Sequence, residues 1–324
     1  MTMGRVLLFA LFLSLNPWSQ APPKSAPAPS QPALRAFVYV EGGKLYYEEC
    51  GIGPEAVILF HDGIAHSAVW DNVWSTFCKR FHTIRYDRRG YGRTPASATW
   101  YRETEDLVTL LRNRKVSHAI LVGSSHGGEL SIDFTLQYPA LVRQLVLVGA
   151  VVSGLPYTDH FLNRGTSNSQ PFEKNDVPGG LANWARDKYL LAPGHDAAKK
   201  RLLELLTTNP QYLTHSDYAR PTQAALPRLK EIRIHTLILV GDADIPDVHA
   251  HAGAIEAGIA GSKRVRITDA GHLMYLERRR IQPCGHRFHR TKRPVRIVLQ
   301  EDCREGQGEN GKRMLSTSTT SRPP

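Results

Sequence analysis

A serine stands at the centre of the pattern Gly123-x-Ser125-x-Gly127, directly after an apolar, β-branched run at 119–122. The run reads as a strand, and the following residues read as a helix that stops before Pro139. Glycines at both flanks let the chain turn tightly enough to leave the central hydroxyl exposed above a sheet, near the positive end of a helix. The pattern therefore indicates a nucleophilic hydroxyl at Ser125, with a plain glycine-rich turn as the alternative for the pattern taken alone. Ser124 is out of register for the role of nucleophile.

A serine hydroxyl is a poor nucleophile at neutral pH, so it needs a positioned base and an acid that orients the base. Two later apolar runs, 237–240 and 265–268, read as strands that end in acidic residues and in His272. His272 is the candidate base. The candidate acids are Asp242, Asp244 and Asp247, and the order serine, aspartate, histidine is one that occurs in α/β enzymes.

The elements that must position these residues alternate between strands and helices. Gly42-Gly43 lies between strand-like segments at 36–41 and 44–49, which predicts a hairpin with a two-residue turn. Further apolar strands are predicted at 56–60, 81–86, 119–122 and 141–151, with helices at 69–77, 100–114 and 248–259. Fully apolar strands that alternate with helices predict an α/β fold, with a mostly parallel central sheet and helices on both faces.

The alternation stops in the middle of the chain. Residues 153–233 show no clear strand, and helices are predicted only at 182–191 and 197–207. We expect this segment to be a helical cap inserted into a core formed by residues 36–152 and 234–277. A cap would lie over the carboxyl ends of the strands, where open α/β sheets keep their ligand sites.

From about Ala36 to Glu277 the chain resembles the α/β-hydrolase superfamily. Four pieces in the family's order carry the resemblance: Asp-Arg-Arg-Gly-Tyr-Gly-Arg-Thr at 87–94, Gly-Ser-Ser-His-Gly-Gly at 123–128, Gly-Asp-Ala-Asp at 241–244 and Ala-Gly-His at 270–272. The resemblance implies that Ser125 is the nucleophile and that His272 acts as general base and then general acid. It favours Asp244 as the orienting acid over Asp242 and Asp247, because relatives place this acid three residues after the glycine.

The same resemblance implies an oxyanion hole built from backbone amides. One amide follows the nucleophile and here belongs to His126. The other follows a His-Gly pair in relatives, whereas this sequence reads His61-Asp62-Gly63. We therefore expect Gly63 to be the second donor, with Ile64 as the alternative, and we expect His61 to pack beneath the site.

These features predict a serine hydrolase that cleaves an ester-like acyl bond through an acyl-enzyme on Ser125, most simply a carboxylic ester hydrolase. The expected partner is a small-molecule acyl substrate, and neither a metal nor an organic cofactor is expected. One alternative is a cofactor-free perhydrolase or acyltransferase with the same three residues. Another is a catalytically silent hydrolase-fold protein that only binds a ligand. The cap sequence does not reveal the substrate.

The N-terminal segment resembles an export signal. Residues 6–15 form an apolar block that is too short to span a bilayer. Ser19-x-Ala21 and Ala26-x-Ala28 are both candidate cleavage sites. Residues 1–21 are therefore predicted to be a signal peptide, and residues 22–35 a linker rich in Pro, Ala and Ser. We expect an exported protein, periplasmic or extracellular, with no stable membrane span.

The formal net charge of +11 is concentrated at the C-terminal end. Residues 278–324 contain 12 Lys or Arg and 4 Asp or Glu, so the remainder of the chain carries a net charge of only +3. We interpret 278–324 as a basic, irregular tail, and its abrupt change of composition suggests out-of-frame translation or a replaced final helix. Such a tail could bind an anionic polymer, but no nucleic-acid partner is expected for the nearly neutral body.

The chain has four cysteines, Cys50, Cys78, Cys284 and Cys303. Four are too few for a disulfide-based scaffold in a chain of this length. A single bridge between Cys50 and Cys78 is possible in an oxidising compartment, but we expect two ordinary buried thiols.

Overall fold

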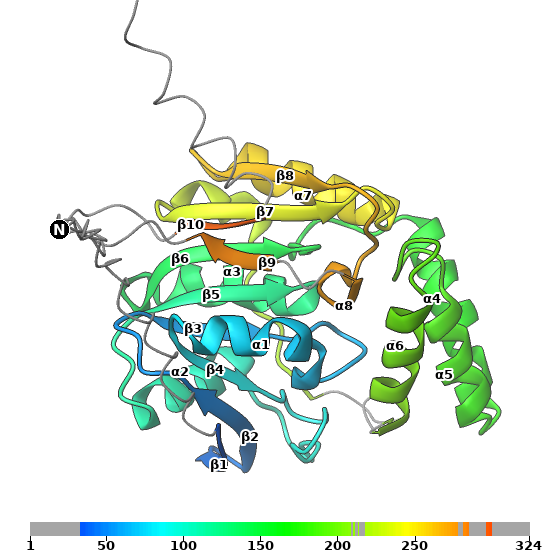
Figure 1. Ribbon diagram of the computed structural model, residues 1–324, viewed down its shortest axis with the longest axis horizontal. Coiled ribbons are helices and arrows are strands. Elements are labelled where there is room, and N and C mark those ends of the chain that lie inside the picture. The colour runs from blue at the N-terminus through cyan, green and yellow to red at the C-terminus, as the bar shows by residue number, and fades with distance from the viewer. Residues whose placement is uncertain are drawn as a thin grey trace, which may run out of the picture. The chain divides into compact units, whose positions relative to one another are not determined.

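The computed structural model describes residues 33–208, 210, 213 and 218–277, together with the backbone of 281–284 and 296–299 (Figure 1). The chain divides into two units, Met1–Ser30 and Gln31–Pro324, and all described residues belong to the second. The predicted signal peptide, most of the predicted linker and most of the predicted tail lie outside the described residues.

A twisted sheet with the strand order β1-β2-β4-β3-β5-β6-β7-β8 forms the centre of the described unit (Figure 1). Strands β3 to β8 are parallel to one another, and only β1 and β2 run antiparallel to their neighbours. This confirms the predicted α/β fold class with a mostly parallel sheet. The strands are β1 Leu34–Val40, β2 Gly43–Cys50, β3 Ala56–Phe60, β4 His82–Tyr86, β5 Ala119–Ser124, β6 Val142–Val148, β7 His235–Gly241 and β8 Lys263–Ile267.

The hairpin turn lies one residue earlier than the sequence predicts. Val40 pairs with Gly43, so the turn consists of Glu41 and Gly42 instead of Gly42-Gly43. Gly42 has a φ of +67°, a conformation that suits glycine. Gly43 belongs to β2 and packs against Arg89, since a Cβ at Gly43 would lie 3.3 Å from the Arg89 Nη1 atom.

Helices cover both faces of the sheet because alternate strand residues are apolar on each side. Helices α2 Glu103–Asn113, α3 His126–Gln137 and α7 Pro246–Gly258 share one apolar core with the sheet. Helices α1 Asp71–Cys78 and α8 Met274–Glu277 belong to the core on the opposite face (Figure 1). The 3₁₀ segments are η1 Ser67–Trp70, η2 Pro139–Leu141 and η4 Leu226–Glu231.

Three helices lie between β6 and β7 and occupy the end of the sheet to which the parallel strands point (Figure 1). They are α4 Asp159–Glu173, α5 Val177–Arg186 and α6 Asp196–Thr208. We call them the cap helices. The sequence predicts α6 closely, places α5 about five residues too late and misses α4.

Cys50 and Cys78 form a disulfide bond, so the expectation of two buried thiols is wrong. Cys50 ends β2 and Cys78 ends α1, and the two Cα atoms lie 5.3 Å apart, within the usual range for a bridge. The sequence does not show that the end of α1 returns to the end of β2. The bridge ties the antiparallel edge of the sheet to the helix that covers it.

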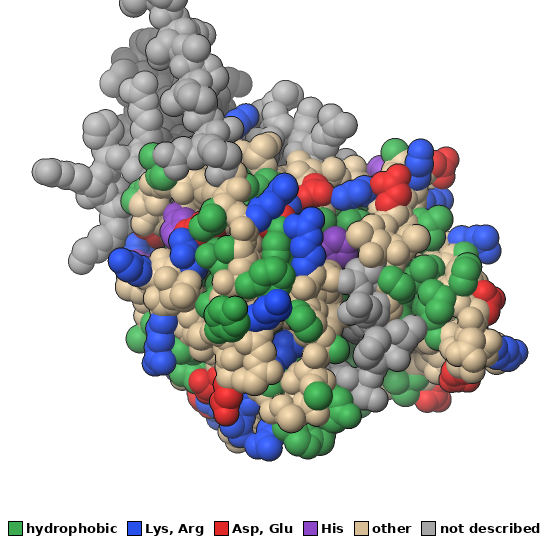
Figure 2. All heavy atoms as spheres, turned by 90° about the horizontal axis from the view of Figure 1, so that it is seen from below, with side chains coloured by type: hydrophobic (Ala, Val, Ile, Leu, Met, Phe, Trp, Pro, Cys, Tyr) green, Lys and Arg blue, Asp and Glu red, His purple; other side chains and the backbone are tan. Residues whose placement is uncertain are grey.

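Two short strands, β9 Ile281–Cys284 and β10 Arg296–Leu299, pair antiparallel within the segment predicted to be an irregular tail. No helix of the described residues is long and apolar enough to cross a bilayer. On the face of the molecule seen from below, basic, acidic and apolar side chains are interspersed (Figure 2).

Candidate active site

Ser125 stands between β5 and α3 with φ 53° and ψ −119°, outside the regions that a non-glycine residue normally adopts. Glycine is required at both flanking positions, because a side chain there would collide with neighbouring backbone atoms. A Cβ at Gly123 would lie 2.3 Å from the Gly127 carbonyl oxygen, and a Cβ at Gly127 would lie 2.5 Å from the His61 carbonyl oxygen. The predicted turn is therefore present, and its strain is held by close packing of backbone on both sides.

His272 and Asp244 meet at the ends of β8 and β7. The His272 Nδ1 atom lies 2.8 Å from the Asp244 Oδ1 atom, and both side chains are buried. Burial lowers the pKa of the His272 imidazole, but the charge and hydrogen bond of Asp244 outweigh it, so the pKa is raised above its ordinary value. The pair leaves Nε2 as the ring nitrogen that can exchange a proton with a neighbour.

The two rival carboxylates have other partners. Asp242 accepts hydrogen bonds from the backbone N–H groups of Asp269 and Ala270, at 3.0 and 3.2 Å. Asp247 accepts from the backbone N–H and the hydroxyl of Thr158, at 2.7 and 2.9 Å. The geometry therefore favours Asp244 as the residue that orients His272.

The end of β6 brings Ser125 and the histidine–aspartate pair to one place. The Ser125 N–H donates to the Val148 carbonyl oxygen at 3.0 Å. The next residue, Gly149, has a φ of +53°, and a Cβ there would lie 3.1 Å from His272 Nδ1 and 3.2 Å from Asp244 Oδ2. Gly149 was not among the predicted site residues, although a glycine directly after a buried strand is a signal for close approach.

The residues that carry the two predicted oxyanion donors, His126 and Gly63, are in contact. His126 is the first residue of α3, so its N–H has no acceptor within the helix. A Cβ added at Gly63 would lie 3.7 Å from the His126 Cβ atom. The Ile64 N–H already donates to the Asp62 carboxylate at 2.8 Å, which favours Gly63 over Ile64 as the second donor.

A buried polar chain links three segments beneath this position. The Ser124 hydroxyl donates to the Tyr275 hydroxyl at 3.0 Å, and Tyr275 donates to the Asp62 carboxylate at 2.9 Å. Asp62, which departs from the His-Gly pair that the family resemblance implies, also accepts the Ala65 N–H at 2.9 Å. The departure from the family pattern is therefore accommodated by a hydrogen-bonded loop, which the sequence alone did not reveal.

The ring of His126 has two carboxylate neighbours and leaves 40% of its side chain exposed. Its Nε2 atom lies 3.0 Å from Glu103 and its Nδ1 atom lies 3.7 Å from Glu129. Partial burial and the charge of Arg88 lower the pKa of His126, but the two glutamates outweigh them and raise it above its ordinary value. The two glutamates therefore hold the His126 ring next to Ser125 and favour its protonated form.

The cap is in direct contact with the loop that carries His272. The His272 N–H donates to the Tyr189 carbonyl oxygen and the Leu273 N–H donates to the Leu190 carbonyl oxygen, both at 2.8 Å. Nearby, Arg164 of α4 pairs with the buried Asp187. The segment after α5 therefore helps to hold the candidate base in place.

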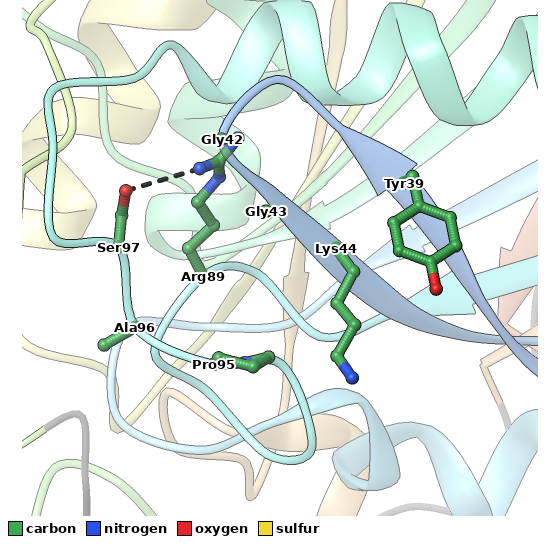
Figure 3. Close-up of a pocket in the computed structure, with 8 residues that line it drawn as sticks. All are labelled: Tyr39, Gly42, Gly43, Lys44, Arg89, Pro95, Ala96 and Ser97. Atoms are coloured by element: carbon green, nitrogen blue, oxygen red, sulfur yellow. Dashed lines mark hydrogen bonds between the residues drawn. The ribbon is translucent and has the colours of Figure 1, made fainter.

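One cavity in the described part of the chain lies away from these residues. It has a volume of about 330 Å³ and lies against the β1–β2 hairpin, with Tyr39, Lys44, Arg89 and Ser97 in its wall (Figure 3). Arg89 donates to Ser97 at 3.3 Å and is otherwise paired with Asp106, so its charge is already satisfied. In the described residues, no group of three or more His, Cys, Asp or Glu side chains is arranged to hold a metal ion.

Two hydrolases are similar to this chain in sequence, one over most of its length and one over a short segment. The chain is 25% identical to 2-hydroxy-6-oxononadienedioate/2-hydroxy-6-oxononatrienedioate hydrolase of Escherichia coli, over 76% of this chain and 92% of that protein. It is 36% identical to 2-(acetamidomethylene)succinate hydrolase of Mesorhizobium japonicum, but over only 32% of this chain and 38% of the relative. The second match is therefore local.

The esterase EaEST from Exiguobacterium antarcticum has a similar fold, with a TM-score of 0.61 and 24% identity over 75% of this chain and 94% of that structure. The model of the Alpha/beta hydrolase family matches residues 57–281, which include Ser125, Asp244 and His272. The eight-stranded sheet, the strained serine turn and this match together assign the chain to the alpha/beta hydrolase family.

Proposed function

We propose that this hydrolase cleaves carboxylic esters of small acyl substrates through an acyl-enzyme on Ser125. The observation that carries the proposal is the buried hydrogen bond between His272 and Asp244, placed against Gly149 at the same rim as the strained Ser125. A serine in this position attacks acyl carbonyls. The fold of the esterase EaEST agrees with this choice but does not by itself decide the substrate.

The proposed reaction has two balanced steps. His272 Nε2 takes the proton of Ser125 while Oγ bonds to the acyl carbon, and the same proton then goes to the leaving alcohol as the ester C–O bond breaks. A water molecule then attacks the acyl-enzyme, gives its proton to His272 and releases the carboxylic acid, and Ser125 recovers its proton. Asp244 holds the ring so that Nε2 is free, and its negative charge stabilises the imidazolium.

In both steps the carbonyl oxygen becomes negatively charged. The N–H groups of His126 and Gly63, which lie on facing residues, are the proposed donors to that oxygen. Loss of one such donor typically costs about 3 kcal/mol of transition-state stabilisation.

The test is covalent labelling. A fluorophosphonate probe should label the wild-type protein at Ser125, and p-nitrophenyl esters of graded acyl length should be hydrolysed. Ser125→Ala should abolish both, whereas Ser124→Ala should retain them. Labelling that persists in Ser125→Ala, or a wild-type protein that neither reacts nor hydrolyses any ester, would contradict the proposal and favour a ligand-binding role.

The proposed site of action is outside the cytoplasm. The Cys50–Cys78 bridge supports this, because structural disulfides persist in oxidising compartments and are rare in the cytosol. Thiol labelling of protein from a culture's periplasmic or extracellular fraction should leave Cys50 and Cys78 unmodified. Retention in the cytosol with both thiols free would contradict export.

A further inference from the structure

The peptide that carries the Gly63 N–H is held from its other side. The carbonyl oxygen of Asp62 lies 2.7 Å from Arg88 Nη2 and 2.8 Å from His61 Nδ1. His61 Nε2 accepts the Arg88 backbone N–H at 3.1 Å, so the ring proton is on Nδ1 and is donated to Asp62. One carbonyl oxygen therefore receives two hydrogen bonds, one of them from a cation.

This arrangement determines where the Gly63 N–H points. In a trans peptide the C=O and N–H groups point in opposite directions, so two donors fixed on the Asp62 oxygen turn the Gly63 N–H away from them. The charged donor on the oxygen, Arg88, also draws electron density from the amide nitrogen, which strengthens its N–H as a donor.

Arg88 is tied in turn to the second oxyanion donor. Its Nη1 atom donates to Glu103 Oε1 at 2.9 Å, and Glu103 Oε2 lies 3.0 Å from His126 Nε2. One carboxylate thus joins the guanidinium that holds the Asp62 carbonyl to His126, whose backbone N–H is the other proposed donor. Arg88 is 3% exposed and Glu103 14% exposed at the side chain, so water competes little for these bonds.

We propose that Glu103 is a positioning residue for the oxyanion hole, because it couples Arg88 to the His126 ring and so fixes the relative placement of the two backbone donors. This inference rests on the proposed function and extends it to a residue that does not touch the substrate. The first residue of α2 thereby affects transition-state binding at a site built by β3 and α3.

A second ion pair on α2 provides a matched control. Arg89, the neighbour of Arg88, is 3% exposed and makes a bidentate pair with Asp106, whose side chain is 7% exposed. Arg89 also contacts the Glu41 carbonyl oxygen, Ser97 and the Tyr101 ring, and none of these belongs to the proposed oxyanion hole. Loss of Asp106 leaves a buried arginine unpaired just as loss of Glu103 does, but not next to the oxyanion hole.

The experiment compares Glu103→Ala with Asp106→Ala on a p-nitrophenyl ester and on an alkyl trifluoromethyl ketone. The ketone adds reversibly to the serine hydroxyl and gives a hemiketal whose charged oxygen occupies the oxyanion hole. For Glu103→Ala we expect kcat to fall by about 30-fold and the inhibition constant of the ketone to rise by a similar factor, less than the loss of a whole donor. KM should change by less than about three-fold, since the ground-state carbonyl needs the hole less.

Asp106→Ala should lower the Tm by about as much as Glu103→Ala does, but it should keep kcat and the inhibition constant near wild type. Glu103→Gln should have a kcat and an inhibition constant between those of Glu103→Ala and the wild type, because the amide oxygen can still accept from Arg88. Equal kinetic losses in the two alanine variants, or a Glu103→Ala enzyme with wild-type kcat, would overturn the inference.

If Glu103→Ala does not fold, His126→Phe answers the same question, because the His126 ring is partly exposed and its removal breaks only one half of the link. It should lower kcat by about 10-fold with little change in Tm. A folded His126→Phe enzyme with unchanged kcat and ketone affinity would also overturn the inference. If the wild-type protein lacks Ser125-dependent hydrolysis, the proposed function itself is wrong and the inference falls with it.

Discussion

Two groups of buried charged residues lie on the same sheet and are bonded differently. At the antiparallel edge, Glu48 accepts from Tyr46 with one oxygen and from Arg85 with the other, at 2.6 to 3.0 Å. We call this group the ion-paired edge. At the ends of β5, β7 and β8, Asp244 has one oxygen on His272 and Ile245, and its Oδ2 atom is buried with no hydrogen-bond partner among the described residues. We call Ser125, Asp244 and His272 the reactive rim.

The difference in bonding suggests that the ion-paired edge contributes to stability and the reactive rim to the proposed reaction. A saturated buried ion pair costs much to break but does not react, because each of its polar atoms is already occupied. The reactive rim has a buried carboxylate oxygen without a hydrogen-bond partner among the described residues, Asp244 Oδ2, and a strained backbone at Ser125. Both features cost stability and occur at functional sites. Mutations in the two groups should therefore have opposite effects on activity and on unfolding.

The largest expected effect is that of Asp244→Asn. An amide at this position favours the wrong ring tautomer of His272, so kcat should fall by about 10⁴-fold with the fold intact. In the wild type the raised pKa of His272 places the acid limb of kcat/KM above the ordinary imidazole value of 6.5. In the variant the residual activity should persist to lower pH, because the neutral amide no longer stabilises the imidazolium.

Stopped-flow or steady-state ester hydrolysis between pH 5 and 9 measures both effects. Asp242→Asn is the control and should stay within about three-fold of wild type, because the hydrogen bonds of Asp242 go to backbone N–H groups and not to His272. A larger loss in Asp242→Asn than in Asp244→Asn would mean that the orienting acid has been misassigned.

The ion-paired edge should show the reverse. Glu48→Ala leaves Arg85 buried with only the partly exposed Asp71 as a charged partner, and we expect a loss of about 3 kcal/mol in the free energy of unfolding. The kcat/KM at a temperature well below the Tm should not change. Urea denaturation and ester hydrolysis on the same sample test this, and a large loss of activity without destabilisation would end the distinction between the two groups.

The parts of this structure that the sequence predicts are those with a local signal. Gly123 and Gly127 define the turn at Ser125, and the apolar runs before Asp244 and His272 place both residues at strand ends. Helix α4 has no such signal, because residues 164–168 are Arg, Gly, Thr, Ser and Asn, which are weak helix formers apart from the arginine. Packing against α5 overrides this local preference.

Contacts between distant residues are the parts that the sequence could not provide. Tyr275 and Asp62 are 213 positions apart, and Glu103 and His126 are 23 positions apart on different helices. The two residues of each pair do not share a motif, and only the packing of α8 and α2 on the sheet brings them together. The disulfide was missed for the same reason, since two cysteines separated by 28 positions carry no signal of proximity.

Reduction of the Cys50–Cys78 bridge should destabilise the edge without affecting the reactive rim. A bridge that closes a segment of 28 residues contributes about 3.6 kcal/mol in the chain-entropy model. Dithiothreitol, or the double variant Cys50→Ser/Cys78→Ser, should therefore lower the Tm, while kcat/KM at 25 °C stays the same. A variant of unchanged Tm would show that the bridge does not form in solution.

The smallest expected effect is a change in stability at Asp133 of α3, which lies between the two ends of the inserted cap segment. Its carboxylate accepts hydrogen bonds from Ser153, which begins the insertion, at 3.4 Å, and from Thr222 near its end. The Ser153 hydroxyl in turn accepts the Ala225 N–H at 2.9 Å. Burial raises the pKa of Asp133 to about 6, and the charge of Glu129 adds to this.

Because the folded pKa of Asp133 lies above its ordinary value of 3.8, its contribution to stability is fully present below pH 4 and is lost as the pH rises through about 6. The neutral mimic Asp133→Asn should therefore match the wild type at pH 4 and exceed it by about 2 kcal/mol at pH 8. Urea unfolding at both pH values measures the difference, and Asp196→Asn, with a 90% exposed side chain on the cap, should show none. If Asp133→Asn is the less stable protein at pH 8, the hydrogen bonds of the ionised carboxylate stabilise the protein by more than its burial destabilises it. The two ends of the cap segment are then held by a charged group, as Arg85 is held by Glu48 at the ion-paired edge.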